Sequence, residues 1–185
     1  MSVRLGADHL LMTPGGMAKG DLTEADLVVV GLEGQLVSGN HRASSEVGMH
    51  IRIYQRRSDV QAVVHAHPPT ATGFGVAGED FMAPVLPELV LQMGAVPLVP
   101  YAMPGGEALA DQFEPFLPNH DAFLMANHGA TTLGPSLTIA HHRMESLEHA
   151  ARILLAARQV GRVNQLTADQ AAALHAAARA ARDSE

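Results

Sequence analysis

The sequence predicts a layered α/β domain with one central sheet, and two features of the chain lead to that prediction. Short apolar runs of strand length alternate with longer stretches in which apolar residues recur every three or four positions. A length of 185 residues suffices for one sizeable core and is short for two independent ones. Because repeats and low-complexity linkers are absent, residues 1–185 are expected to form a single domain.

The first half of the chain predicts a β-hairpin, a helix and a further strand. Two apolar runs flank a segment that contains Gly31 and Gly34, which is typical of a hairpin turn. Paired serines then open a helix whose inward side would carry Met49 and Ile53. The expected bounds are residues 27–37 for the hairpin, 43–57 for the helix and 59–67 for the strand.

The second half predicts two strands and three helices. Pro135 and Ser136 are start signals for the longest helix of the chain. An Ala-rich segment near the end of the sequence predicts a final helix, since alanine has the highest helix propensity. The expected bounds are residues 94–99 and 122–126 for the strands, and 107–117, 135–160 and 167–182 for the helices.

Charge and composition exclude several classes of protein. The 12 Lys and Arg residues are scattered and outnumbered by 19 Asp and Glu, whereas a nucleic-acid surface needs clustered positive charge. No apolar run approaches the roughly 20 residues of a membrane span, and the N-terminus lacks the pattern of a signal peptide. There is no cysteine, so any bound metal must be held by nitrogen and oxygen. We therefore expect a cytoplasmic protein.

Two histidines end the strand predicted over residues 59–67, just before two prolines. Residues two apart on a strand share a face, so His65 and His67 would project side by side while Val64 and Ala66 point the other way. Two imidazoles on one rigid face can converge on one metal ion. The pattern alone fits equally well two histidines that merely pack or face solvent, so it does not decide between these alternatives.

A third histidine follows another predicted strand. His128 stands in the sequence Asn127-His128-Gly129, and Gly129 leaves out a side chain where a ligand or another backbone can approach closely. A single histidine at a strand end is more often structural. As a third nitrogen beside His65 and His67 it suits catalytic zinc, which commonly takes three protein ligands and keeps one position open.

Ser44 and Ser45 precede Glu46 at a predicted helix start, where hydroxyls and free N–H groups suit an anion. The simpler interpretation is helix capping, but a capping box needs Ser or Thr three residues before the glutamate, and Ala43 stands there. Glu46 is therefore available for another role. A rival row on the long helix, with His141, Glu145 and His149 spaced four apart, is interpreted as a polar helix face.

In their order, these motifs resemble the class II aldolase/adducin family, and most closely its L-fuculose-1-phosphate aldolases. The matching segments are MTPGGMAKGDLTEADLVVV, SSEVGMH, DVQAVVHAHPPTA, VPLVPYAMPGG and LMANHGATTLG, followed by the long helix. The likeness covers almost the whole chain. It implies a three-layer α/β/α sandwich on a central, mainly antiparallel sheet, and a homotetramer with shared active sites.

The resemblance also implies a role for each candidate residue. In such aldolases the histidine pair and the strand-end histidine bind zinc, which carries over to His65, His67 and His128. The glutamate after the paired serines is the acid/base residue and matches Glu46. A tyrosine in the P-Y-A-x-x-G segment, here Tyr101, reaches the site of a neighbouring subunit. The substrate phosphate is held by a Thr-Pro-x-Gly turn and the serines, which match Thr13, Gly15, Gly16, Ser44 and Ser45.

The implied activity is that of a zinc-dependent lyase that cleaves a ketose phosphate to dihydroxyacetone phosphate and an aldehyde. Zn²⁺, or another divalent ion, would supply Lewis acidity, and Glu46 would move a proton beside the carbonyl. The alternatives are an L-ribulose-5-phosphate 4-epimerase, a dehydratase or a decarboxylase of the same family. The compact spacing from His67 to His128 favours an aldolase, since the epimerases carry a longer intervening segment. A non-catalytic, adducin-like module would lack the complete set of histidines.

One expectation concerns the start of the chain. Family members begin with a helix and a Gly-Asn turn, usually read G-N-[VIL]-S-V-R, whereas this sequence starts Met1-Ser2-Val3-Arg4. In an alignment with this pattern, Met1 takes the place of the apolar residue that follows the asparagine. The valine codon GTG can serve as a bacterial start codon, and the residue is then written as Met. We expect the reading frame to continue upstream through the turn and a helix of about three or more turns. A stop codon directly upstream would contradict this.

Overall fold

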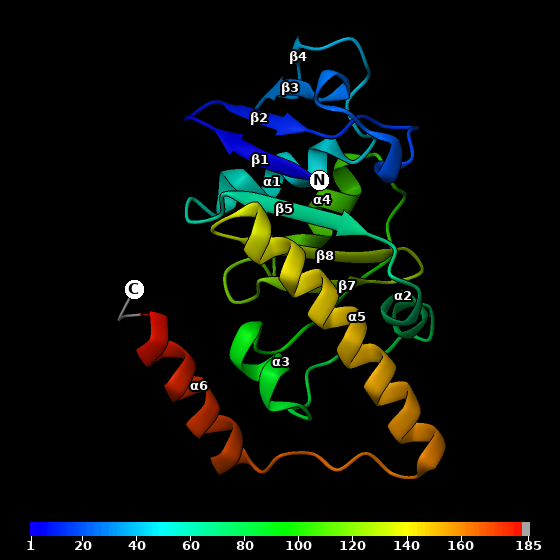
Figure 1. The fold of residues 1–185 in the computed structure, drawn as a ribbon, viewed down its shortest axis with the longest axis vertical. Coiled ribbons are helices and arrows are strands. Elements are labelled where there is room, and N and C mark those ends of the chain that lie inside the picture. Colours follow the sequence, from blue (N-terminus) through cyan, green and yellow to red (C-terminus); the bar gives the residue numbers. More distant parts are fainter. Residues whose placement is uncertain (183–185) are drawn as a thin grey trace.

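A computed structural model describes residues 1–182, and in this part of the chain eight strands form one sheet (Figure 1). The strand order is β4-β3-β2-β1-β5-β8-β7-β6. Every neighbouring pair is antiparallel except β6 and β7, which are parallel. The strands are β1 Ser2–Leu5, β2 His9–Met12, β3 Val28–Gly31, β4 Leu36–Ser38, β5 Ala62–Ala66, β6 Leu98–Val99, β7 Ala122–Met125 and β8 Gly129–Gly134.

Helices cover both faces of the sheet. Figure 1 shows α5 crossing the near face, with α2 and α3 beside it, while α1 and α4 lie behind the sheet. The last helix, α6, packs against α3. The helices are α1 Val47–Arg56, α2 Pro69–Val76, α3 Pro87–Gln92, α4 Glu107–Phe113, α5 Leu137–Val160 and α6 Ala168–Arg182, with short 3₁₀ turns η1 Lys19–Asp21 and η2 Glu24–Asp26.

The core consists of two apolar layers, one on each side of the sheet. On β5, Val63 packs into the cluster that holds Met49 of α1 and Phe113 of α4. The next residue, Val64, packs on the opposite face with Leu147 of α5. Successive strand residues point to opposite faces, so this alternation fills both layers from one strand. The three-layer α/β/α sandwich on a mainly antiparallel sheet, expected from the sequence, is confirmed.

Most of the predicted elements are present, with shifted ends. The helix expected from residue 43 begins at Val47, and the strand expected to include His67 ends at Ala66. The helix expected to reach residue 117 ends at Phe113. The hairpin of β3 and β4, the strand β7 and the helices α5 and α6 lie where the sequence predicts them. In the described part of the chain, no helix is long and apolar enough to span a membrane.

Three strands and two short helices were not predicted. Strands β1 and β2 have only four residues each, which is too short for a clear periodicity. All six residues of β8 are buried, so this strand lacks an alternating pattern. The prolines after β5 do end the strand, but Pro69 is also the first residue of α2, a position where proline is favoured. The remaining helix, α3, likewise begins at a proline.

Candidate functional site

Three histidines from distant parts of the sequence converge at one end of the sheet. His65 is the fourth residue of β5, and His67 follows the end of that strand. His128 lies in the turn between β7 and β8, where Asn127 adopts a left-handed φ of 55° that asparagine tolerates. The three ring centroids are 5.0–5.3 Å apart. The pairing of β5 with β8 brings the turn beside the end of β5.

The environment of His65 identifies which of its nitrogens is free. Its Nδ1 lies 2.9 Å from the carbonyl oxygen of Ala130, which can only accept a hydrogen bond. Nδ1 therefore carries a proton, and Nε2 is the nitrogen that can offer a lone pair to a metal ion. This Nε2 is buried, lies 2.7 Å from Glu46 Oε2, and makes no aligned hydrogen bond with any residue in the range 1–182. A lone pair and a carboxylate oxygen at this distance need a cation or a proton between them.

Glu46 connects two of the three histidines. One carboxylate oxygen, Oε2, approaches Nε2 of His65, and the other, Oε1, lies 2.8 Å from Nε2 of His128. Glu46 is the N-cap residue of α1, but its side chain makes no capping hydrogen bond. Only 8 % of the residue is exposed, although a buried carboxylate is costly unless it is paired. The sequence expectation that Glu46 is not used in capping is therefore confirmed.

The histidines also set the charge state of the site. Burial raises the pKa of Glu46, but the close contact with His65 and the charges of His65, His128 and His67 outweigh burial and lower the pKa below its usual value. Burial lowers the pKa of His67, and the charges of His65 and His128 lower it further. Burial also lowers the pKa of His128 against the opposing charge of Glu46. These shifts favour an ionised Glu46 carboxylate beside neutral rings of His67 and His128.

These residues fit a bound divalent ion. Each histidine offers one nitrogen, and the three nitrogens all lie within 4.8 Å of one another. Nδ1 of His128 is, like Nε2 of His65, buried and without a hydrogen bond among the described residues. A set of three neutral imidazoles suits zinc and other transition metals. Because His67 is exposed, the site remains open to a small molecule from one side.

Gly129 is required by the close packing of this site. A Cβ atom at this position would lie 2.5 Å from Cδ2 of His67 and 2.6 Å from the carbonyl oxygen of Ala66. The sequence expectation of a close approach at Gly129 is confirmed, and the approaching groups belong to the end of β5 itself.

We expect Gly129→Ala to displace the His67 ring and to weaken metal binding. Overpacking of this kind costs about 1–3 kcal/mol of unfolding free energy, and denaturant unfolding together with a metal titration would measure both effects. Gly73→Ala in α2 is the matched control, because a Cβ there meets nothing within 4 Å. It should leave metal affinity unchanged. Wild-type metal affinity in Gly129→Ala would show that the position of His67 does not depend on this packing.

Three of the residues predicted to hold a phosphate, Gly15, Ser44 and Ser45, lie side by side next to Glu46. The N–H of Gly15 donates to the carbonyl oxygen of Arg42 at 3.2 Å, and a Cβ at Gly15 would lie 3.5 Å from Cα of Ser44. The backbone amide of Glu46 donates to Ser44 Oγ at 3.3 Å. We call the set Thr13, Gly15, Gly16, Ser44 and Ser45 the cradle. It offers hydroxyls and N–H groups but no charge.

Thr13 of the cradle and the predicted residue Tyr101 lie in different surroundings from the serines. The Thr13 hydroxyl is buried and accepts a hydrogen bond from the Met1 amino group at 2.9 Å. Tyr101 is 57 % exposed on the loop that follows β6. The same loop reaches the cradle at Gly105, where a Cβ would lie 3.3 Å from the carbonyl oxygen of Ser45. The roles of Thr13 and Tyr101 stay predictions.

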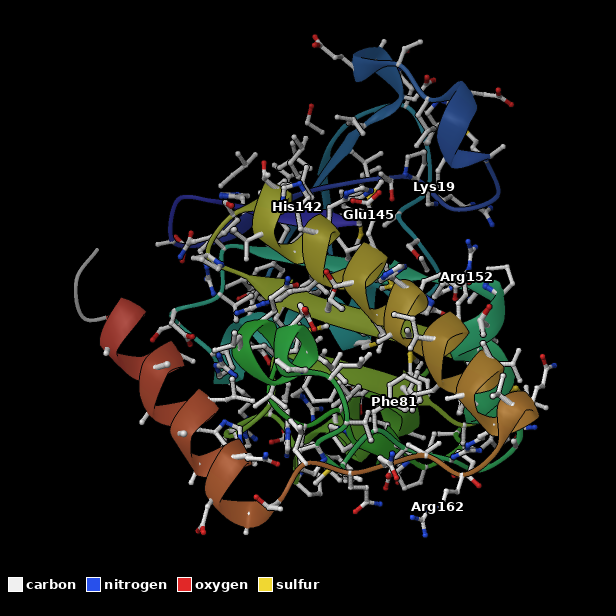
Figure 2. All side chains as sticks on the ribbon, turned by 60° about the horizontal axis from the view of Figure 1, so that its bottom comes forward. Lys19, Phe81, His142, Glu145, Arg152 and Arg162 are labelled. Carbon is white, nitrogen blue, oxygen red and sulfur yellow. The ribbon has the colours of Figure 1, made fainter. Side chains whose placement is uncertain are left out.

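The rival row on α5 is no metal site in the part of the chain that the structure describes. His141 and Glu145 form a loose, exposed contact of 3.6 Å, and the two do not join any cluster of potential ligands. Figure 2 labels Glu145 on this helix, and its side chain is 66 % exposed. The interpretation as a polar helix face is confirmed for these two residues.

Sequence reasoning missed one residue that supports the site from α5. Glu148 lies on α5, and its carboxylate accepts hydrogen bonds of 2.9 Å from the N–H groups of Thr70 and Ala71. These groups belong to the first turn of α2, which begins two residues after His67. Glu148 thus fixes the direction in which the chain leaves the histidine pair. No local pattern could reveal this contact, because Glu148 lies 78 residues from Thr70 and 77 residues from Ala71 in the sequence.

The fold and the site together define a class of protein: an α/β/α sandwich with three histidines and one buried glutamate at the end of its sheet. The family model of the class II aldolase and adducin N-terminal domain matches residues 1–155. The chain belongs to this family.

Named relatives carry two kinds of activity. The 3-oxo-tetronate 4-phosphate decarboxylase of Pectobacterium atrosepticum is 34 % identical over 94 % of this chain and 81 % of its own length. The L-fuculose phosphate aldolase of Methanococcus maripaludis is 31 % identical over 83 % of this chain and 82 % of its own length. A solved structure of an L-fuculose 1-phosphate aldolase superposes with a TM-score of 0.87 at 28 % identity, covering 94 % of this chain and 82 % of that one. The resemblance stated from the sequence is confirmed.

Proposed function

We propose that this protein is a metal-dependent lyase that breaks a carbon–carbon bond next to the carbonyl group of a small phosphorylated sugar derivative. What supports this most is the buried carboxylate of Glu46, which lies between His65 and His128 and beside the lone pair of His65 Nε2. The histidines would hold a divalent ion, with Zn²⁺ the expected one. When bound, such an ion supplies a Lewis acid that draws electron density toward a carbonyl oxygen.

The other residues of the site would position the substrate and transfer a proton. The cradle would position the substrate phosphate, so that the reacting carbons lie beside the histidines; orientation of this kind is a large part of catalysis. Bond cleavage leaves an electron pair on the carbon next to the carbonyl, and that carbon must then take up a proton. Glu46 is placed to pass this proton from water, because it is ionised, buried and next to the histidines.

Within this class we favour decarboxylation of a 3-oxo-tetronate 4-phosphate or a close analogue. The decarboxylase relative named above aligns over nearly the whole chain, which supports this choice over the aldolase expected from the sequence. In decarboxylation the bond from C1 to C2 breaks, carbon dioxide leaves, and a proton takes its place on C2. The product, dihydroxyacetone phosphate, is the one that the expected aldolase would also release. The second candidate, aldol cleavage of a ketose phosphate, is supported by the aldolase relatives.

The two reactions differ in what they require of Tyr101. Aldol cleavage must remove a proton from the hydroxyl group that becomes the aldehyde, whereas decarboxylation has no such step. We therefore propose Tyr101, reaching a neighbouring subunit of a homotetramer, as the residue that only the aldol reaction needs. Its exposure and its place on a loop are compatible with a role across a subunit boundary.

The test compares both reactions in the metal-loaded protein. Released carbon dioxide is measured with a 3-oxo-tetronate 4-phosphate, and released aldehyde with a panel of ketose phosphates. We expect kcat/KM for decarboxylation to be larger by at least roughly tenfold. Tyr101→Phe should leave decarboxylation within about threefold of wild type, because no step of it uses the phenol. Faster aldehyde release that Tyr101→Phe abolishes would establish the aldolase instead, and light scattering would report the assembly state.

A further inference from the structure

Thr131 is a fully buried polar residue on β8. The register of the sheet places it directly opposite His65 on β5, and Figure 1 shows the two strands side by side. Directly opposite residues of antiparallel strands share a face of the sheet, with their Cβ atoms roughly 4.5–5.5 Å apart. The side chain of Thr131 therefore lies beside the imidazole of His65, on the face of the sheet that packs against Met49 of α1.

The neighbours of Thr131 decide where its hydroxyl proton points. His65 Nδ1 carries a proton, because it lies 2.9 Å from the carbonyl oxygen of Ala130. The hydroxyl oxygen of Thr131 is 3.2 Å from the same nitrogen, so it accepts a hydrogen bond from this N–H group. The proton of the hydroxyl is then left for the sulfur of Met125, 3.3 Å away. Thr131 thus accepts from His65 and donates to Met125.

Among the described residues, His65 is the only strong hydrogen-bonding partner of the Thr131 hydroxyl. Its other contacts are the sulfur atoms of Met49 and Met125, and a thioether is a weak acceptor. A buried hydroxyl is costly unless it is hydrogen-bonded, and valine has the same shape without that cost. The next residue behaves differently, because the equally buried hydroxyl of Thr132 donates to the carbonyl oxygen of Ala140 at 2.7 Å and so ties β8 to α5. The hydroxyl of Thr131 serves a side chain of the site instead.

The two acceptors at Nδ1 act on the nitrogen that would bind a metal ion. Nε2 of the same ring faces Glu46 at 2.7 Å. An acceptor at one ring nitrogen of a metal-binding histidine fixes the tautomer and the orientation of the ring, and it makes the other nitrogen a stronger ligand. The carbonyl of Ala130 would remain with any side chain, whereas the second acceptor depends on Thr131. We infer that Thr131 is a positioning residue that orients His65 and strengthens its bond to the metal ion, an inference that rests on the proposed function, in which His65 is a metal ligand.

The experiment measures metal binding by the full chain and needs no substrate. The dissociation constant for Zn²⁺ is determined by competition with a chromophoric chelator. The visible absorption bands of the Co²⁺-loaded protein report the geometry of the ligands. Thr131→Val removes the hydroxyl and keeps the shape of the side chain, and Thr131→Ser keeps the hydroxyl. Thr132→Val is the matched control, because it removes an equally buried hydroxyl one residue along the same strand.

We expect Thr131→Val to weaken Zn²⁺ binding by about 10-fold, the low end for loss of a group that supports a metal ligand, because the Ala130 carbonyl remains. Thr131→Ser should bind Zn²⁺ within about threefold of wild type, since it keeps the acceptor oxygen. The Co²⁺ bands should shift in Thr131→Val and return to their wild-type positions in Thr131→Ser. Thr132→Val should lower the melting temperature, because it loses a buried hydrogen bond, but it should leave Zn²⁺ affinity and the Co²⁺ bands unchanged.

Wild-type Zn²⁺ affinity and unchanged Co²⁺ bands in Thr131→Val would overturn the inference, while the proposed metal-dependent function would stand. An equal loss of affinity in Thr132→Val would also overturn it, because the effect would then belong to any buried hydroxyl of β8. If the wild-type protein binds no Zn²⁺, the proposed function fails and the role of Thr131 fails with it. Circular dichroism checks the fold of each variant. Should Thr131→Val not fold, Thr131→Ala removes the same hydroxyl, and wild-type affinity in that variant would be equally decisive against the inference.

Discussion

Replacing both His65 and His67 by alanine is expected to abolish metal binding. The wild-type protein should carry about one divalent ion per chain, because three nitrogens converge within 4.8 Å of one another. The double variant leaves His128 as the only histidine of the trio, and a single imidazole cannot compete with water and buffer for a divalent ion. Either single replacement should also empty the site after dialysis, since catalytic zinc commonly needs three protein ligands.

Elemental analysis of the dialysed proteins measures this directly. The control is His141→Ala with His149→Ala on α5, which removes two histidines from the polar helix face and should leave the metal content at about one ion per chain. Circular dichroism would check that each variant is folded. Full metal content in His65→Ala/His67→Ala would mean that the ion is bound elsewhere, and the assignment of the site would then be wrong.

Glu46→Gln should lower kcat by at least about 100-fold, the low end for loss of a general acid–base residue. The replacement keeps the size of the side chain, but an amide cannot take up and release a proton at neutral pH. The metal content should remain near wild type, because the three histidines are unchanged. Lost turnover with retained metal separates the proton-transfer role of Glu46 from a role as a ligand.

The control for Glu46→Gln is Glu145→Gln on α5, which makes the same chemical change at an exposed position. It should leave kcat unchanged. Steady-state kinetics of the three proteins with the substrate proposed above provides the comparison. Turnover by Glu46→Gln at the wild-type rate would remove Glu46 from the mechanism, and loss of the metal would instead make it a ligand.

The sequence by itself determined the local features of the site. A period of two predicted that His65 and His67 share one face of a strand; in the structure His65 lies on β5 and His67 directly follows its end. Ala43 excluded the capping box, which left the carboxylate of Glu46 free. The glycine after His128 indicated a close approach, because only a missing side chain permits one. Each of these inferences depends on residues a few positions apart.

Only the tertiary structure decided how these features meet. The sheet order places β8 beside β5, and the register that pairs Ala66 with Ala130 brings His128 to the end of β5. The contact of Glu46 with two histidines depends on α1 lying on the same face of the sheet as His65. A local sequence pattern indicates whether a segment is a helix or a strand, but it does not indicate which other elements pack beside that segment. Strand order and register are fixed by which apolar faces can be buried together, and that is a property of the whole chain.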